Sequence, residues 1–283
     1  MLSASALPKI LSLEKTAQHT RFFDFRKGLF GMIFAGMLAM GFLLGFCGAG
    51  GSGMTIALLV AGYGVPMHKA FAVAITAMIF TMISGTVSHL REGEVEVKMG
   101  LIIGGAGMVG AFVGAHVAHS LPTNELGFFT AMMMFLSAII MYIRLYHKAW
   151  LDRHIHIRKM QPEGRELLVL GSATGVVMGF LSGAFGIGAT AFIQLALMMF
   201  FGVSLLKTVG TCMLVILPIS IAGSAGYILN GHLDMGIFVQ TFLGLVIGSF
   251  IGAKFTSLAP RPVLQAVVTA TPLIGGLVIF LNR

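Results

Sequence analysis

The sequence has few charged residues, and this scarcity decides the class of protein. Charged residues make up 10% of the 283 residues, while hydrophobic residues make up 57%. A soluble globular domain carries about 25% charged residues, which it needs to cover its surface with groups that water solvates. The composition therefore excludes a soluble fold and indicates a chain that lies largely in lipid.

Cysteine is scarce, and no carboxylate lies in the middle of an apolar segment. Cys47 and Cys212 stand far apart in apolar surroundings, which predicts two small buried side chains and no disulfide framework. The ten acidic residues all fall in arms, loops or at the ends of apolar runs. Since cation carriers and intramembrane proteases place ionisable groups at membrane depth, we expect neither class. We also expect no enzyme activity, no cofactor and no metal site.

The basic residues do not form the continuous face that a nucleic-acid-binding protein presents. The formal net charge is +8, but the lysines and arginines collect in a few loops between apolar runs. Such enrichment in the loops on one side is typical of membrane proteins. We therefore expect membrane lipids and a small anion as partners and no nucleic acid, with a homodimer left open.

Eight apolar runs are long enough to cross a bilayer, which takes about 17–25 residues of helix. They lie near residues 28–62, 70–89, 99–119, 125–146, 166–202, 208–228, 235–256 and 263–281. The first and the fifth of these runs are too long for one straight crossing. The sequence predicts an all-α, polytopic membrane protein with about eight transmembrane helices.

Glycines interrupt both of the long runs, as GFCGAGGSG at 45–53 and GFLSGAFGIG at 179–188. Each Gly in a helix interior costs about 1 kcal/mol relative to Ala, so such clusters predict a discontinuous or re-entrant helix. Ten crossings would result if each run formed a full hairpin, but the basic loop at 147–165 would then be exported. The charge distribution favours eight crossings of the cell inner membrane, with both termini and that loop in the cytoplasm.

The two halves of the sequence are related by a constant shift of 138 residues, which we call the repeat offset. It aligns Gly64 with Gly202, Lys69 with Lys207, Gly85 with Gly223, Gly93 with Gly231, Gly110 with Gly248, Gly114 with Gly252, and Pro122 with Pro260. We predict two four-helix repeats, at 28–146 and 166–283, each with a broken first helix. Residues 1–27 precede them as a cytoplasmic or interfacial arm. Four crossings in each half would give both repeats the same orientation.

Other glycines stand four residues apart on one helix face. They are Gly171, Gly175, Gly179 and Gly183, Gly41 with Gly45, Gly110 with Gly114, and Gly248 with Gly252. Small residues at this spacing allow helix backbones to approach closely in a membrane. We assign them a packing role.

The two glycine-rich breaks are the candidate substrate site. A helix that breaks inside a protein frees backbone N–H groups, and the half-helix that follows points its positive dipole end at the gap. Two such breaks predict a site for a small anion, with nearby hydroxyls as further donors. The residues are Gly50, Gly51, Ser52 and Gly53 in the first break and Gly186, Gly188 and Thr190 in the second. The alternative is that both breaks are kinks that serve only tight packing.

Two lysines and two threonines are expected to assist the anion. Lys69 and Lys207 follow the breaks at equivalent positions, where a pair of cations at one external mouth would attract anions. The alternative is that both lysines simply extend to the lipid headgroups. Thr76 and Thr211 are expected to lie deepest among the hydroxyls of the helices that follow, and to contact the substrate.

A histidine and an arginine end the second span and are candidates for coupling. His89 can titrate near neutral pH and couple transport to protons, while Arg91 can hold an anion through paired donors. The second half has Tyr227 and Leu229 at the corresponding positions. The alternative is that both residues are interfacial anchors.

At these motifs the sequence resembles the TauE/SafE family of sulfite and organosulfonate exporters, also called the toluene-sulfonate uptake permease family. The resemblance covers about residues 28–283. It rests on GFCGAGGSGMTIALLVAGYGVPMHKA at 45–70, GFLSGAFGIGATAFIQLALMMFFGVSLLKTVGT at 179–211, and Gly-x-x-x-Gly-Ala at 110–115 and 248–253. The family's usual Gly-x-Gly-Gly-Gly run is interrupted here by Ser52, and no Pro follows either run closely, which leaves the substrate open.

The breaks and the resemblance together predict a secondary transporter of small sulfur oxyanions. The resemblance implies sulfite or C2 organosulfonates such as sulfoacetate as substrates, and export as the direction. Two alternatives remain, an anion channel of the same architecture and an uptake permease for sulfur compounds. The missing catalytic groups argue against an enzyme.

Overall fold

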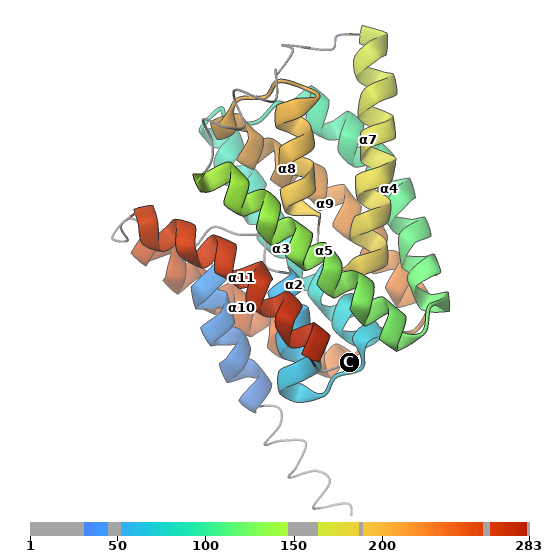
Figure 1. Cartoon of the computed structure of the whole chain (residues 1–283), viewed down its shortest axis with the longest axis vertical. Helices are drawn as coiled ribbons and strands as arrows, with labels where there is room; N and C mark the ends of the chain where they lie inside the picture. Colours follow the sequence, from blue (N-terminus) through green and yellow to red (C-terminus); the bar gives the residue numbers. More distant parts are fainter. Residues whose placement is uncertain (1–30, 45–51, 147–163, 187–188, 257–260, 282–283) are drawn as a thin grey trace, which may run out of the picture.

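The computed structural model describes residues 31–44, 52–146, 164–186, 189–256 and 261–281, and every regular element in these ranges is a helix. In chain order they are the Gly31–Leu44 helix, α2 (Ser52–Ala57), the π-helical η1 (Leu58–Gly62), α3 (Met67–Arg91), α4 (Val97–Ser120), α5 (Thr123–Tyr146), α7 (Gly164–Phe185), α8 (Thr190–Met199), α9 (Leu205–Leu229), α10 (Met235–Thr256) and α11 (Arg261–Leu281). The predicted all-α fold is confirmed within these ranges (Figure 1). The predicted arm at 1–27, Cys47 and most of the loop at 147–165 lie outside them.

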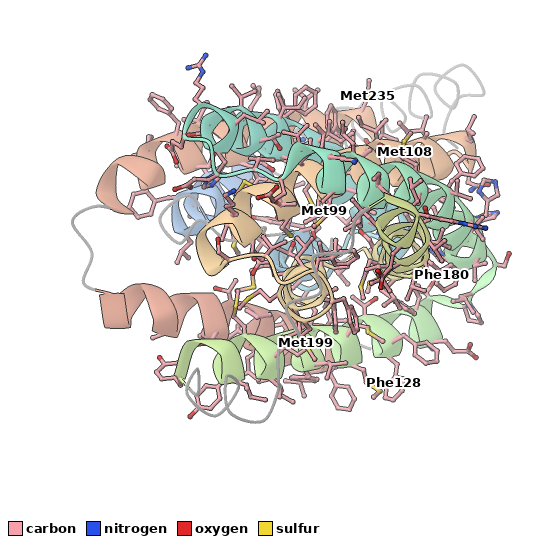
Figure 2. The ribbon with its side chains drawn as sticks, turned by 90° about the horizontal axis from the view of Figure 1, so that it is seen from above. Met99, Met108, Phe128, Phe180, Met199 and Met235 are labelled. Carbon is pink, nitrogen blue, oxygen red and sulfur yellow. The ribbon has the colours of Figure 1, made fainter. Side chains whose placement is uncertain are left out.

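Six described helices are long and apolar enough to cross a bilayer. They are Met67–Arg91, Val97–Ser120, Thr123–Ile143, Gly164–Phe185, Lys207–Leu229 and Met235–Gly252. Their outer faces expose large apolar side chains, among them Met108 and Met235 (Figure 2), which lipid accommodates and water does not. The described helices therefore form a multi-pass membrane protein. The predicted count of eight crossings is not confirmed, because the remaining apolar stretches have only 10–17 residues; they are Gly31–Leu44, Ser52–Gly62, Thr190–Met199 and Thr269–Leu281.

Glycines bring α4 and α7 into backbone contact. A Cβ atom added to Gly179 would collide with the carbonyl oxygen of Gly107, and one added to Gly183 would collide with that of Ala111. The contacts advance along both helices in the same direction, so α4 and α7 run parallel. The packing role predicted for this ladder of glycines is confirmed.

The Gly31–Leu44 helix packs against α10 through equivalent residues. A Cβ atom on Gly248 would collide with the carbonyl oxygen of Leu38, as one on Gly110 would with that of Val176. The repeat offset carries Gly110 onto Gly248, and it also carries Leu38 onto Val176. The first helix of each half therefore packs against the other half, and the two seams are the same contact with the halves exchanged.

The helix starts recur at the repeat offset as well. It carries the first residues of α2, α3, α4 and α5 onto the first residues of α8, α9, α10 and α11, respectively. The glycines that precede α3 and α9, Gly64 and Gly202, have φ angles of 65° and 63°. Only Gly adopts this left-handed backbone without strain, so both halves place a glycine at the same point before the next helix.

The equivalent helices α3 and α9 lie side by side at the centre of the bundle and run antiparallel. The Oγ1 atom of Thr76, near the start of α3, lies 2.6 Å from the Oγ atom of Ser224, near the end of α9. Further along α3, a Cβ atom on Gly85 would collide with the side chain of Met213.

The prediction that both halves share one orientation is therefore wrong. It treated each broken run as a single crossing of the membrane. In the structure α8 instead turns back toward the end of the molecule at which α7 begins (Figure 1). Because α8 returns, α9 begins at the same end of the molecule as α7, and this reverses the expected direction of α9 relative to α3.

Candidate substrate site

The second glycine-rich run breaks where the sequence predicts. The helix α7 ends at Phe185, and Gly186 has a φ angle of 68°. Ala189 has a φ angle of 46°, the left-handed conformation that L-residues rarely adopt, and α8 begins directly after it at Thr190. The predicted interruption of the run 166–202 is confirmed, while Gly188 lies outside the described residues.

The first run is described on both sides of its glycines. The Gly31–Leu44 helix precedes them, and the Ser52–Gly62 helix, which consists of α2 and η1, follows. Ser52 and Gly53 form the buried start of this second helix. Gly50 and Gly51 lie outside the described residues.

Each of the two half-helices lies toward a different end of the bundle. The Ser52–Gly62 helix leads into α3 and α8 leads into α9 through equivalent turns, closed by hydrogen bonds from Val65 N to Leu59 O (2.9 Å) and from Val203 N to Leu197 O (3.1 Å). Since α3 and α9 are antiparallel, the half-helices end at opposite ends of the molecule. Their N-terminal ends therefore both lie toward the middle (Figure 1).

The second break also packs against the first half-helix. A Cβ atom on Gly186 would lie 2.9 Å from Cδ1 of Ile56, one turn into α2, and 3.0 Å from the ring of Phe71 on α3. The Oγ1 atom of Thr130 on α5 donates to the carbonyl oxygen of Phe185, at 3.4 Å. The structure thus brings the end of α7 and the start of α2 together, although they are far apart in the sequence.

A buried hydroxyl without a hydrogen-bond partner stands at the start of each half-helix. The Oγ atom of Ser52 and the Oγ1 atom of Thr190 are both buried and unpaired, and the repeat offset carries one residue onto the other. The first N–H groups of each half-helix also have no partner within the helix. Leaving a buried polar group unpaired costs about 1–3 kcal/mol. Both starts therefore offer donors, and a positive dipole end, to an anion.

Three other buried side-chain atoms in the described ranges have no partner. They belong to Thr86 on α3 and to Gln240 and Thr241 on α10. None of them stands at the start of a helix. The pair formed by Ser52 and Thr190 differs because its members occupy equivalent positions in the two halves.

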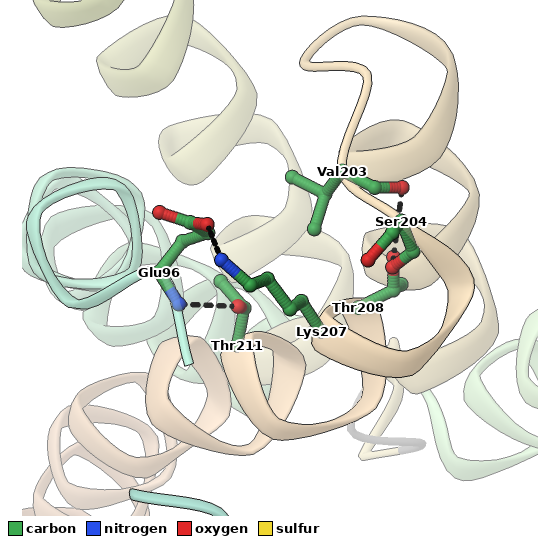
Figure 3. A network of polar contacts seen from close by, with 6 residues as sticks. All are labelled: Glu96, Val203, Ser204, Lys207, Thr208 and Thr211. Atoms are coloured by element: carbon green, nitrogen blue, oxygen red, sulfur yellow. Dashed lines mark hydrogen bonds and ion pairs between the residues drawn. The ribbon is translucent and has the colours of Figure 1, made fainter. Parts of the chain in front are cut away.

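Thr76 and Thr211 do not lie together. Thr76 is near the start of α3, where its hydroxyl bonds to Ala72 O (2.6 Å) and to Ser224. Thr211 is near the start of α9, at the other end of this antiparallel pair, and its Oγ1 atom accepts a hydrogen bond from the backbone N–H of Glu96 at 2.9 Å (Figure 3). Both are buried, as expected, but Thr211 caps the start of α4.

Lys69 and Lys207 lie at opposite ends of the molecule, which contradicts their predicted place at one mouth. Each begins one member of the antiparallel pair α3 and α9, so equivalent positions fall at opposite ends. Each lysine pairs with an acid at the start of a helix from the other half. Lys69 Nζ is 3.6 Å from Asp234 Oδ2, and Lys207 Nζ is 2.6 Å from Glu96 Oε1 (Figure 3).

His89 is held by carboxylates, while Arg91 is exposed. His89 Nδ1 lies 3.0 Å from Glu94 Oε2 and 3.8 Å from Glu92 Oε2. The ligand atoms of these three residues lie within 4.8 Å of one another, but exposed acidic groups commonly converge without a metal. The proton-coupling role of His89 and the expectation of no metal site both stay predictions.

Sequence reasoning missed the acidic partners of the two lysines. The repeat offset that aligns Lys69 with Lys207 also aligns Glu96 with Asp234, so the signal was present. It was overlooked because Asp and Glu are different residue types.

These features define the class of protein. It is a polytopic helical membrane protein in which two half-helices direct their starts toward the middle of the bundle.

The chain belongs to the family described as Sulfite exporter TauE/SafE, whose model matches residues 32–279. The comparisons therefore show a membrane transporter of this family. Similar proteins are named probable membrane transporter proteins. YdhB of Bacillus subtilis is 42% identical over 86% of this chain and 97% of its own length. YjnA of the same organism is 26% identical over 85% of this chain and 95% of its own length. No solved structure matches the chain.

Proposed function

We propose that the protein is a secondary transporter that moves a small sulfur oxyanion, sulfite or a C2 organosulfonate such as sulfoacetate, out of the cell across the inner membrane. The observation that carries this proposal is the pair of unpaired hydroxyls at the starts of two opposed half-helices. Family membership supports the sulfur oxyanion as substrate, because the family is described as a sulfite exporter.

An oxyanion suits the N-terminal ends of the two half-helices for electrostatic reasons. Each half-helix presents backbone N–H groups and a partial positive charge of about half an elementary charge. Ser52 and Thr190 add one O–H donor each, and a tetrahedral or pyramidal oxyanion has acceptor oxygens on several sides. No acidic residue is described in either half-helix to repel it. A cation would meet the wrong end of both dipoles.

The arrangement supports an inverted repeat with six full crossings and two re-entrant hairpins. In this scheme α3, α4 and α5 cross in the first half, and α9, α10 and α11 cross in the second. The helix α7, although long enough to cross, forms a hairpin with α8 instead. Each hairpin consists of the first helix of a half and the half-helix that returns to the same side. Three crossings in each half give the halves opposite orientations, as in other carriers with inverted repeats.

The distribution of basic residues supports one orientation of this scheme. Arg91, Lys98, Arg165 and Lys207 lie at the end of the bundle where α7 begins, whereas Lys69 lies at the other end. By the positive-inside rule the first of these ends faces the cytoplasm. The Gly31–Leu44 helix begins, and α11 ends, at the opposite end (Figure 1). This orientation therefore places the start and the end of the described chain outside the cytoplasm, whereas the prediction placed both inside.

Transport by the purified protein tests the proposal. The protein is reconstituted into liposomes, and the flux of labelled sulfite, sulfoacetate and chloride is measured. We expect saturable flux of sulfite or sulfoacetate, and counterflow when unlabelled substrate is placed on the far side. Unitary currents without counterflow would instead support an anion channel. The absence of any saturable sulfite or sulfonate flux would refute the proposal.

Removing the two hydroxyls tests the site itself. The double variant Ser52→Ala/Thr190→Val should lower the flux at least about tenfold, since hydrogen bonds to charged groups are worth about 1.5–3 kcal/mol. Each single variant should show a smaller loss of flux, because the two hydroxyls act on the substrate from opposite sides. Ser84→Ala, which removes an exposed hydroxyl of α3, is the matched control. Wild-type flux in the double variant would show that the hydroxyls do not bind substrate.

A further inference from the structure

Three histidines from three separate segments meet at the end of the molecule where α3 begins. His119 Nδ1, at the end of α4, lies 2.8 Å from Nε2 of His232 in the turn before α10. The ring of His68, on the first turn of α3, stacks on the ring of His232 with a centroid distance of 5.1 Å. His68 Nε2 also lies 3.0 Å from the carbonyl oxygen of Ala118. We call this group the histidine triad.

The geometry of the triad favours the uptake of one proton at a time. In the close contact between His119 and His232, one ring nitrogen donates a hydrogen and the other accepts it. Two fully protonated rings would lose this bond and would repel each other. Lys69 on α3 acts on His232 and pairs with Asp234 at the start of α10. His116, one turn earlier on α4, bonds to its own helix at Phe112 O.

The surroundings also decide where His232 titrates. Burial, followed by the neighbouring His68, His119 and Lys69, lowers the pKa of His232 from its ordinary value of 6.5. The ring of His232 therefore gains its proton at a lower pH than an ordinary histidine does. This agrees with the stacked and hydrogen-bonded geometry, which suits neutral rings.

Packed aromatic rings join the triad to the second break. The ring of Tyr227 lies 6.3 Å from that of His232 and 6.0 Å from that of Phe71. The Tyr227 hydroxyl donates to the carbonyl oxygen of Gly183 at 2.8 Å, in the last turn of α7. Phe71 in turn packs against Gly186. A change in charge or ring position at the triad therefore has a contiguous physical route to the substrate site.

We propose that His68, His119 and His232 form a proton-binding site that makes anion transport depend on the pH at this end of the protein. This inference rests on the proposed function, because it assumes that an anion passes this end. One proton from water adds one positive charge beside Lys69, and this charge raises the local concentration of anions. No bond other than an N–H bond forms or breaks. His89, at the other end, takes no part.

Titration of the histidines tests the proton site without any transport. The protein is labelled with 15N-histidine, and the ring nitrogens are followed by NMR as the pH is lowered. We expect one signal, lost in His232→Gln, to titrate below 6.5. Lys69→Met should move this midpoint to higher pH, because it removes a neighbouring positive charge. A His232 signal that titrates at the ordinary pH, unchanged by Lys69→Met, would overturn the proton site.

Flux in liposomes tests the link to transport. Sulfite or sulfoacetate flux in the wild-type protein should rise several-fold as the pH is lowered on the triad's side alone. His232→Gln should abolish this response, whereas His116→Gln and His89→Gln should keep it. A full pH response in His232→Gln would overturn the inference while leaving the proposed function intact. The absence of flux in every variant, wild type included, would refute the proposed function, and the NMR titration would still decide the proton site.

Discussion

The turn between α3 and α4 and the turn between α9 and α10 have the same backbone and different side chains. Gly93 and Gly231 both have a φ angle of 71°. Glu94 N donates to His89 O at 2.9 Å, and His232 N donates to Tyr227 O at 3.1 Å. One turn therefore carries a histidine and carboxylates, while the other carries a tyrosine and a histidine.

Comparing the two turns separates the features that both halves share from those that differ. Both α3 and α9 end with a glycine in the left-handed conformation, a common way for a helix to end and one that favours glycine. Both halves also form equivalent ion pairs, Lys69 with Asp234 and Lys207 with Glu96. Each pair links a helix of one half to a helix of the other. The titratable groups of the two turns differ in their partners: His89 pairs with Glu92 and Glu94 of its own turn, whereas His232 contacts histidines of the other half.

The largest expected effect comes from filling the shared glycine seams. Gly179→Val and Gly41→Val should each prevent assembly of the protein, because a Cβ at either position meets backbone atoms of the partner helix. Overpacking costs about 1–3 kcal/mol where side chains can move aside, and backbone atoms have less freedom to do so. The measurement is the monodisperse fraction after extraction in detergent. Gly105→Val, with no atom within 4 Å of its added Cβ, is the control.

The two seams should respond alike. If one variant assembles normally and the other does not, the equivalence of the halves at their first helices is contradicted. Normal assembly of both would show that the seams tolerate a side chain.

A smaller effect is expected on transport when the second break is filled. Gly186→Ala should lower the flux about tenfold or more while the protein still assembles, because the added methyl group displaces Ile56 and Phe71 beside the proposed site. Gly64→Ala is the matched control, since Gly64 has nearly the same φ angle but no atom within 4 Å of an added Cβ. Both variants carry the same backbone strain of about 1–2 kcal/mol. Equal flux in the two variants would show that strain alone, and not the site, controls the effect.

Much of the fold could be predicted from the sequence because its physical signals are local. Apolar runs predicted helices, glycine spacing predicted the seams, and the run 179–188 predicted the break at Gly186. The repeat offset, read from pairs such as Gly64 and Gly202, also relates the first residues of equivalent helices in the structure. Apart from that offset, each of these inferences depends on residues that are close together in the chain.

The orientation of the halves and the partners of the site residues could not be predicted in the same way. Whether α8 crosses the membrane or returns depends on packing against helices far away in the sequence, such as the contact of Gly186 with Ile56 and Phe71. The lysines were recognised, but their acidic partners come from the other half. The histidine triad combines residues 68, 119 and 232, and no local pattern indicates that they meet.

The smallest expected effect concerns the two equivalent ion pairs. Both are partly exposed, and such pairs are worth about 0–1 kcal/mol. Lys207→Met should lower the thermal midpoint slightly more than Lys69→Met, because Lys207 lies 2.6 Å from its acid and Lys69 lies 3.6 Å from its own. A double-mutant cycle with Glu96→Gln isolates the energy of the first pair from other effects of each change. The coupling should shrink at high salt, which screens exposed charges. A coupling energy larger for Lys69 with Asp234 than for Lys207 with Glu96 would contradict the expected difference between the two ends.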